Sequence, residues 1–332
     1  MKFRLKFSSL LAVLFLGSIE IARSQFDGSG RNREPIEAIK PAPVADPQKL
    51  SLGEQLFNDP ILSGKNELSC SACHNLQAGG TVPLRRTIGY SGRQHRYNAP
   101  TIFNVANNYR LGWRGNFTSL EDQNEEVLLD PNLMASDWPS LLAKLGGSRY
   151  RPLFRNAYGH DPSRADVLDA LVTFQRSLAT PNSRFDRYLG GDKQALSPDE
   201  IEGYELFKNY GCVSCHQGSN IGGNLFQKFG IFAPPSANPD PTYDGDLGRF
   251  TITHKPQDRG VFRVPSLRNV ALTAPYFHDG RADTLTQAVD TMAKNQLGQQ
   301  ISPDDINLLV GFLKTLTGEY KGVALAPPER KH

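Results

Sequence analysis

Two short motifs hold every cysteine of the chain. The four cysteines form two Cys-x-x-Cys pairs, and a histidine directly follows the second cysteine of each pair. This arrangement is typical of covalent haem attachment, because two thiols can bond to the porphyrin edge while the adjacent imidazole binds the iron. The sequence therefore predicts two covalent c-type haems, held by Cys70, Cys73 and His74 and by Cys212, Cys215 and His216.

Two other kinds of site use the same residue types. A Cys-x-x-Cys pair can be a thioredoxin-like redox centre, but that centre needs a strand–helix unit, which the sequence around the pairs does not indicate. The two pairs could instead share one zinc ion, but zinc would leave His74 and His216 without a role. The repeated motif favours haem over both alternatives.

The first 24 residues resemble a secretory signal peptide. Basic residues at positions 2, 4 and 6 precede an apolar run over residues 10–19, and small residues at 22 and 24 predict cleavage before Gln25. The apolar run is shorter than the roughly 20 residues that a membrane-spanning helix needs. We therefore expect a cleaved signal rather than an anchor, and no membrane span in the exported chain.

The remaining sequence predicts a mainly α-helical protein with few strands. A polar, proline-rich arm over residues 25–48 leads into helical patterning near Pro47, and residues 166–178 and 302–319 have amphipathic spacing. Ser197 is expected to cap a helix that starts at Pro198, with Glu200 completing a capping box. The net charge of +3 is not concentrated in basic blocks, so nucleic acid is not an expected partner.

An internal repeat divides the chain into two halves. The stretches SLGEQLFND (residues 51–59) and IEGYELFKN (201–209) are similar, and each precedes one haem motif. The sequence thus predicts two cytochrome c-like haem domains with long loops. The expected boundaries are 1–24 for the signal peptide, 25–48 for the arm, 49–185 and 186–322 for the two haem domains, and 323–332 for a tail.

Three further stretches are specific enough to indicate a family: residues 98–108 (NAPTIFNVANN), 211–230 (GCVSCHQGSNIGGNLFQKFG) and 262–289 (FRVPSLRNVALTAPYFHDGRADTLTQAV). Over about residues 45–320 the chain resembles the bacterial di-haem cytochrome c peroxidase and MauG superfamily. The resemblance implies that the C-terminal haem transfers electrons and that the N-terminal haem is the peroxidatic one. It also implies a methionine as sixth ligand of the C-terminal haem, which here is Met292. MauG has a tyrosine at that place, so in this respect the chain is similar to the peroxidases.

The resemblance implies two more features between the haems. One is a Ca²⁺ ion bound by the Asn98 side chain and by the backbone carbonyls of Thr273 and Pro275, which are hard oxygen donors that suit calcium. The other is a tryptophan that relays electrons, which matches Trp113, ten residues before a matching Gln123. Without the resemblance, Asn98 would be assigned to a turn and Trp113 to a buried core.

The pocket of the first haem departs from the family pattern at two places. Alignment puts Tyr90 where the resting peroxidases have a distal histidine ligand, while His95 in the same loop is a second candidate and an open iron is the third alternative. Leu133 occupies the position of the distal glutamate that moves protons on peroxide, and a leucine cannot do this. Three nearby carboxylates could replace it or be solvated: Glu125, Glu126 and Asp130.

Three functions remain open at this point. The resemblance implies, first, a periplasmic cytochrome c peroxidase that reduces hydrogen peroxide with electrons from a small cytochrome c or cupredoxin, using Gln123, Trp113 and Tyr90 as candidate catalytic residues. The second is a MauG-like enzyme that uses a high-valent di-haem state to oxidise a residue such as tryptophan on a partner protein. The third is a non-enzymatic di-haem electron carrier. The family often forms homodimers, which the sequence leaves open here.

Overall fold

Helices and long loops make up most of the computed structural model, which describes residues 34–233 and 242–327. The predicted signal peptide and its cleavage point lie outside these residues. The two sheets in the described part have only two strands each, which confirms the mainly α-helical class. The α-helices are α1 (Pro47–Asn58), α2 (Leu120–Leu129), α3 (Trp138–Gly146), α4 (Tyr150–Tyr158), α5 (Arg164–Ser177), α6 (Arg184–Leu189), α7 (Pro198–Asn209), α8 (Phe250–Thr253), α9 (Leu285–Thr291) and α10 (Pro303–Lys314). The strands are β1 (Phe226–Lys228), β2 (Val261–Arg263), β3 (Glu319–Tyr320) and β4 (Val323–Ala324), paired antiparallel as β1–β2 and β3–β4.

The helix boundaries follow the expected capping signals. Ser197 caps α7, Pro198 is its first residue, and the side chain of Glu200 returns to the backbone of Ser197, so the predicted capping box is confirmed. The last long helix, α10, starts after Ser302 as expected but ends at Lys314, before the expected 319. The chain then turns into the β3–β4 hairpin, so the start of the expected tail is paired strand.

The repeated glycine of the two similar stretches lets two helices cross closely in each half. A Cβ atom on Gly53 of α1 would lie 2.0 Å from the carbonyl oxygen of Ala170 in α5, and one on Gly203 of α7 would lie 2.2 Å from that of Leu308 in α10. No side chain larger than hydrogen fits at either crossing. The repeat therefore encodes a helix pair, α1 with α5 and α7 with α10, which are also the pairs in closest contact.

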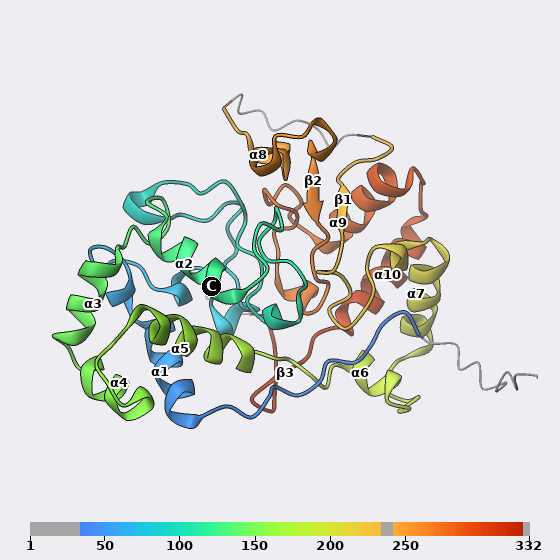
Figure 1. Ribbon diagram of the computed structural model, residues 1–332. Coiled ribbons are helices and arrows are strands. Elements are labelled where there is room, and N and C mark those ends of the chain that lie inside the picture. The colour runs from blue at the N-terminus through green and yellow to red at the C-terminus, as the bar shows by residue number, and fades with distance from the viewer. Residues whose placement is uncertain (1–33, 234–241, 328–332) are drawn as a thin grey trace, which may run out of the picture. The chain divides into compact units, whose positions relative to one another are not determined.

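Two clusters of buried apolar side chains lie under these helix pairs. The first contains residues between Leu52 and Leu178, and the second contains Ile36 and residues between Phe185 and Leu316. In Figure 1 the blue and green helices around α1 and α5 lie beside the yellow and red helices around α7 and α10. The described residues from Pro35 onward nevertheless form one compact unit, so the expected domain boundary at 185/186 stays a prediction.

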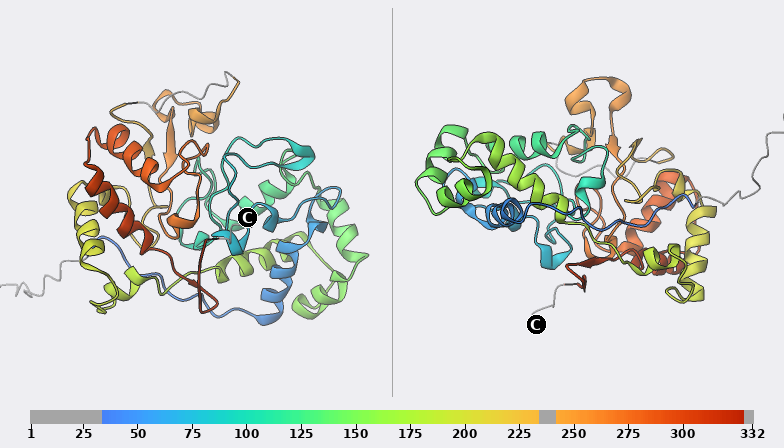
Figure 2. Two further views of the ribbon diagram at one scale, coloured as in Figure 1. Left: turned by 180° about the vertical axis from the view of Figure 1, so that it is seen from behind. Right: turned by 60° about the horizontal axis from the view of Figure 1, so that its bottom comes forward.

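Both ends of the described chain cross from one half to the other (Figure 2). Ile36 is buried in the second cluster, although the arm that carries it leads into α1 of the first half. In the opposite direction, Tyr320 of β3 follows α10 but packs on Phe103 of the first half, with 5.2 Å between the ring centroids. The two halves are therefore held by the chain ends as well as by their common interface.

A pair of asparagines shows the repeat at the centre of the molecule. Asn104 and Asn269 both have left-handed backbone conformations, with φ of 57° and 60°. Each donates its side-chain amide to the same hydroxyl, that of Thr180, over 2.7 and 3.0 Å. The loops after the two haem motifs are thus joined at one buried point.

Among the described residues, no helix is long and apolar enough to cross a membrane.

Candidate functional site: two histidine motifs and an apolar cavity

The two Cys-x-x-Cys-His motifs adopt the same backbone turn. Each forms a 3₁₀ turn, Cys70–Ala72 or Cys212–Ser214, in the loop after α1 or α7. The amide of His74 donates to the carbonyl of Cys70 and that of His216 to the carbonyl of Cys212, both over 3.0 Å. The tight turn puts two thiols and an imidazole close together in each motif.

Both imidazoles are oriented by a backbone carbonyl. The Nδ1 atom of His74 lies 3.3 Å from the carbonyl oxygen of Gly80, and that of His216 lies 3.2 Å from that of Ile221. Because a carbonyl only accepts, Nδ1 carries the proton in each ring and Nε2 is left with a free lone pair. This arrangement is typical of metal-binding histidines, whose second nitrogen is fixed by a hydrogen bond.

Burial keeps the two imidazoles neutral. It lowers the pKa of His216 to about 4 and lowers the pKa of His74 as well. A neutral imidazole is the form that binds a metal ion. Both the protonation state and the orientation of His74 and His216 therefore suit metal binding.

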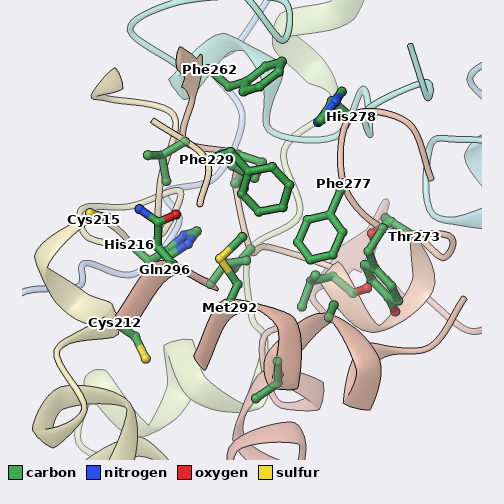
Figure 3. Close-up of a pocket in the computed structure, with 18 of the residues that line it drawn as sticks. Cys212, Cys215, His216, Phe229, Phe262, Thr273, Phe277, His278, Met292 and Gln296 are labelled. Atoms are coloured by element: carbon green, nitrogen blue, oxygen red, sulfur yellow. The ribbon is translucent and has the colours of Figure 1, made fainter. Parts of the chain in front are cut away.

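An apolar cavity of about 240 Å³ opens beside the second motif (Figure 3). Cys212, Cys215 and His216 line it on the side of the motif, and Met292 reaches it from the end of α9. Phe229 and Phe277 border the same space. Two thiols, an imidazole, a thioether and aromatic walls are a suitable donor set and lining for a haem.

A zinc site that uses both cysteine pairs does not fit this arrangement. Cys70 packs against the first apolar cluster and Cys212 against the second. Burial raises the pKa of Cys70 to about 12 and that of Cys212 to about 11, which disfavours the thiolate that zinc requires. The group of potential metal ligands that the described residues bring together, Asp246 with His278 and Asp279, contains no cysteine.

A π-helical turn positions Met292. α9 is closed at its start by the Thr284–Gln287 capping box and runs directly into a π-helical segment, Met292–Leu297. Gln296 in this segment accepts a hydrogen bond from the amide of Gly230 over 3.0 Å and donates to the carbonyl of Lys228 over 3.1 Å. Such π-helical turns are frequent at functional sites, and this one is tied to the loop that follows β1.

The structure brings the residues expected between the haems to the same cavity. Asn98, Trp113, Thr273 and Pro275 all line it. The indole nitrogen of Trp113 donates to the backbone carbonyl of Asn98 over 2.9 Å. The side-chain amide of Asn98 donates to Leu84, while its Oδ1 atom and the carbonyls of Thr273 and Pro275 accept no hydrogen bond from a described residue. These three oxygens are therefore available to a hard cation.

The two departures from the family pattern lie next to each other. The amide of Tyr90 donates to the carbonyl of Asn132 over 3.1 Å, directly before Leu133. His95 lies further along the same loop and uses its Nδ1 atom to accept the amide of Tyr97 over 3.2 Å. Burial lowers the pKa of His95 and outweighs the opposing effect of the charge on Asp130. The structure thus places Tyr90, Leu133, His95 and Asp130 in one region, and none of them lines the cavity beside the second motif.

The nearby carboxylates are not equivalent. Glu125 accepts from the indole of Trp138 over 2.8 Å and forms an ion pair with Arg164, and the hydrogen bond from that guanidinium lowers its pKa. Glu126 is exposed. Asp130 closes the turn after α2 by accepting the amide of Asn132 over 2.7 Å. The ion pair with Arg164 keeps Glu125 ionised and engaged. This argues against Glu125 as a replacement for the missing acid–base group.

Gln123 lies half-buried on α2. The next residue, Asn124, exchanges two hydrogen bonds with Gln175 of α5 over 2.9 and 2.7 Å, which fixes the rotation of α2. Gln123 and Tyr90 do not line the cavity beside His216. Their assignment to the pocket of the first haem stays a prediction.

Sequence reasoning missed two residues that border the cavity. His278 is buried, stacks on Phe262 with 4.2 Å between the ring centroids, and meets Asp246 over 2.7 Å. Arg263, the last residue of β2, is 4% exposed. Both stand in the 262–289 stretch, but the sequence does not show which of its polar residues face inward.

Known proteins share the sequence and the fold of this chain. The profile of the family described as "Di-haem cytochrome c peroxidase" matches residues 47–194. The chain is 42% identical to cytochrome c551 peroxidase of Nitrosomonas europaea, over 86% of this chain and 85% of that protein. It is 32% identical to the methylamine utilization protein MauG of Methylorubrum extorquens, over 89% and 85% of the two chains. Among solved structures, a MauG-like protein associated with microbial copper homeostasis superposes with a TM-score of 0.74 at 31% identity, covering 85% of this chain and 94% of that one.

Proposed function

Because this chain belongs to the di-haem cytochrome c peroxidase family, a family of haem oxidoreductases, we propose that it reduces hydrogen peroxide with electrons from a small cytochrome c or cupredoxin. Each turnover takes one peroxide, two electrons from two one-electron donors and two protons, and releases two molecules of water. The observation that supports this proposal best is the cavity that His216 and Met292 both line, because a histidine–methionine pair is typical of a haem that accepts electrons.

We assign the haem contacts residue by residue. Cys70 and Cys73 would hold one haem covalently and Cys212 and Cys215 the other, with the Nε2 atoms of the adjacent histidines toward the iron. The bound haems supply one-electron redox chemistry at iron. The chain itself excludes water from the second pocket with phenylalanine side chains and presents a neutral imidazole and a thioether.

Trp113 is the proposed link between the two haem regions. It lines the cavity of the second motif, and its indole is hydrogen-bonded to Asn98 in a loop that belongs to the first half. An aromatic ring fixed between two redox groups can shorten the distance over which an electron passes. Gln123 and Tyr90 are the residues that we place at the peroxide pocket.

The proposed activity is tested by mixing the purified di-haem protein with a reduced small cytochrome c and hydrogen peroxide. We expect two cytochromes oxidised for each peroxide consumed. Peroxide consumption without cytochrome oxidation, together with oxidative modification of a co-purified or added protein, would instead support the MauG-like alternative. Electron exchange with cytochrome c but no peroxide consumption would contradict the proposal and would support the third alternative, a non-enzymatic electron carrier.

A calcium ion is proposed at the three free oxygens of Asn98, Thr273 and Pro275. The ion would join the loop that carries Asn98, and through it Trp113, to the loop before His278. We expect a calcium chelator to lower peroxidase turnover and added Ca²⁺, but not Mg²⁺, to restore it. Metal analysis that finds no calcium in the active protein would overturn this assignment.

The cellular setting completes the proposal. We place the mature chain in the periplasm, after cleavage before Gln25, where c-type haem attachment and the small electron donors are found together. We also propose two haem domains, residues 49–185 and 186–322. Whether the active form is a homodimer is tested by light scattering of the purified protein with and without Ca²⁺.

A further inference from the structure

Two arginines of the 262–289 stretch are buried, and they differ in their surroundings. Arg263 is 4% exposed and Arg268 is 1% exposed. The guanidinium of Arg268 meets the carboxylate of Asp186 over 2.7 Å and donates to the carbonyls of Ser219 and Glu37, both over 2.7 Å. The buried positive charge of Arg268 is therefore balanced by the carboxylate of Asp186.

Arg263 has no such compensation. Its Nε atom donates to the carbonyl of Gly112 over 3.0 Å, and Nη1 has a long 3.4 Å contact with the carbonyl of Val264. Its Nη2 atom donates to no described residue, and no carboxylate of the described chain pairs with it. Burial lowers the pKa of Arg263 to about 10, without an opposing contribution from an acidic group. A buried charge normally has a counter-ion.

The cavity beside Arg263 shows where such a counter-ion would lie. Arg263 lines this cavity together with Cys212, Cys215, His216 and Met292. Among the described residues, no aspartate or glutamate lines it, and the other side chain there with a permanent positive charge, Lys228, is exposed. The charged part of the lining is thus cationic only. The group expected to bind there, a haem, carries two propionate carboxylates.

We propose that Arg263 is the counter-ion of a haem carboxylate in the pocket of the second motif. An arginine offers a planar pair of donors that matches a carboxylate, and the free Nη2 atom supplies one of them. The inference rests on haem binding at Cys212–His216 but not on the reaction that the protein catalyses.

The same residue would connect the haem pocket to the tryptophan loop. The backbone amide of Arg263 donates to the carbonyl of Trp113 over 2.9 Å, and its guanidinium donates to Gly112. A carboxylate bound by the guanidinium would therefore be joined through one side chain to the loop that carries Trp113. Arg263 is in this sense a positioning residue for Trp113 as well as a partner of the cofactor.

The first test is the redox potential of the His216/Met292 haem in the Arg263→Met variant of the di-haem protein. A cation beside the haem favours the reduced state, in which the iron has one positive charge less. We expect the midpoint potential of this haem to shift to lower values, while that of the His74 haem stays unchanged. An unshifted potential in a variant that binds both haems would overturn the proposal.

A second measurement covers the case in which Arg263→Met does not accumulate with both haems. The resonance Raman propionate bending modes report hydrogen bonding to the haem carboxylates directly. We expect these modes to shift in Arg263→Lys, because an ammonium cannot reproduce the planar donor pair, and to stay in place in the matched control Arg268→Lys. Equal spectra for wild type and Arg263→Lys would contradict the assignment.

A haem count distinguishes a wrong haem assignment from a wrong inference on Arg263, and it does not depend on the catalysed reaction. A haem count of one in a Cys212→Ala/Cys215→Ala variant shows that the second haem is bound where we place it. If the count stays at two, the haem assignment itself is wrong. If the count falls to one but the propionate bending modes are the same in wild type and Arg263→Lys, only the inference on Arg263 fails.

Discussion

Among the described residues, Met292 is the one methionine that lines the cavity beside His216. The chain has three methionines: Met1 belongs to the predicted signal peptide, and Met134 is 3% exposed within the first apolar cluster. Met292 lines the cavity that His216 also lines. The soft sulphur of Met292 would raise the reduction potential of a haem bound there.

The Met292→Ala variant should lose the low-spin histidine–methionine spectrum of one haem, because alanine provides no sixth ligand. The measurement is the absorption spectrum of the oxidised protein, including the near-infrared band of methionine-bound haem. Met134→Leu is the matched control and should keep the spectrum of the wild type. If Met292→Ala leaves the spectrum unchanged, Met292 is a packing residue.

We predict that Leu133 limits proton transfer at the first haem, because it stands where the resemblance implies a distal glutamate. The Leu133→Glu variant puts a carboxylate where the peroxidases have one, so we expect the reaction with peroxide to become faster, by up to about 10²-fold if proton transfer limits it. The measurement is the second-order rate of the protein with peroxide. Leu129→Glu, an exposed position on α2, is the control. Equal rates for both variants would show that another group already moves the proton.

In each half, two helices cross closely at a single glycine. Gly203 of α7 lies against the backbone of α10, whereas Gly311 within α10 has no atom within 4 Å of its hypothetical Cβ. The two positions therefore separate the effect of a close crossing from the effect of glycine on helix stability. This comparison is made on the same pair of helices.

Gly203→Ala should lower the free energy of unfolding by about 1–3 kcal/mol, because the added methyl group meets the carbonyl of Leu308. Gly311→Ala should be neutral or raise it by up to about 1 kcal/mol, since alanine is the better helix former. Thermal or denaturant unfolding of the two variants measures both changes. A similar effect at the two sites would mean that α7 and α10 are not in contact at Gly203.

The N-terminal arm is tied to the second half through a buried ion pair. Asp186 at the start of α6 meets Arg268, and its carboxylate also accepts the amide of Ile39 in the arm over 3.2 Å. Arg268 donates to the carbonyl of Glu37 from the other side of the pair. The arm then continues into α1, so this ion pair helps to hold the two halves in one unit.

Asp186→Asn should lower the free energy of unfolding by about 3–5 kcal/mol, because it leaves the guanidinium of Arg268 buried without its partner. The control is Asp161→Asn, which removes exposed ion pairs with Arg151 and Arg155 and should change the free energy of unfolding far less, because solvent screens these charges. Chemical denaturation of the two variants compares these values. Equal losses would show that the arm is not stabilised by the buried pair.

Local signals were sufficient for several features of this protein. The spacing of Cys212, Cys215 and His216 is a property of five consecutive residues, and the structure forms a tight turn there. The cap at Ser197 and the start of α1 at Pro47 depend on neighbours within one helical turn. The glycine of each repeated stretch was visible as a pattern, although only the structure shows that Gly53 and Gly203 are needed for helix crossings.

Other features depend on which distant segments meet, and the sequence could not give them. The pairing of Glu125 with Arg164, the gathering of Asn98, Trp113 and Met292 around one cavity, and the crossing of the chain ends all join residues far apart in the chain. Burial decides their chemistry, because the same arginine side chain is a compensated structural cation at 268 and an uncompensated one at 263. The sequence by itself thus determined the two Cys-x-x-Cys-His motifs at which haem attachment is predicted. Only the tertiary structure decided what surrounds them, since charge compensation and pocket lining arise from long-range packing.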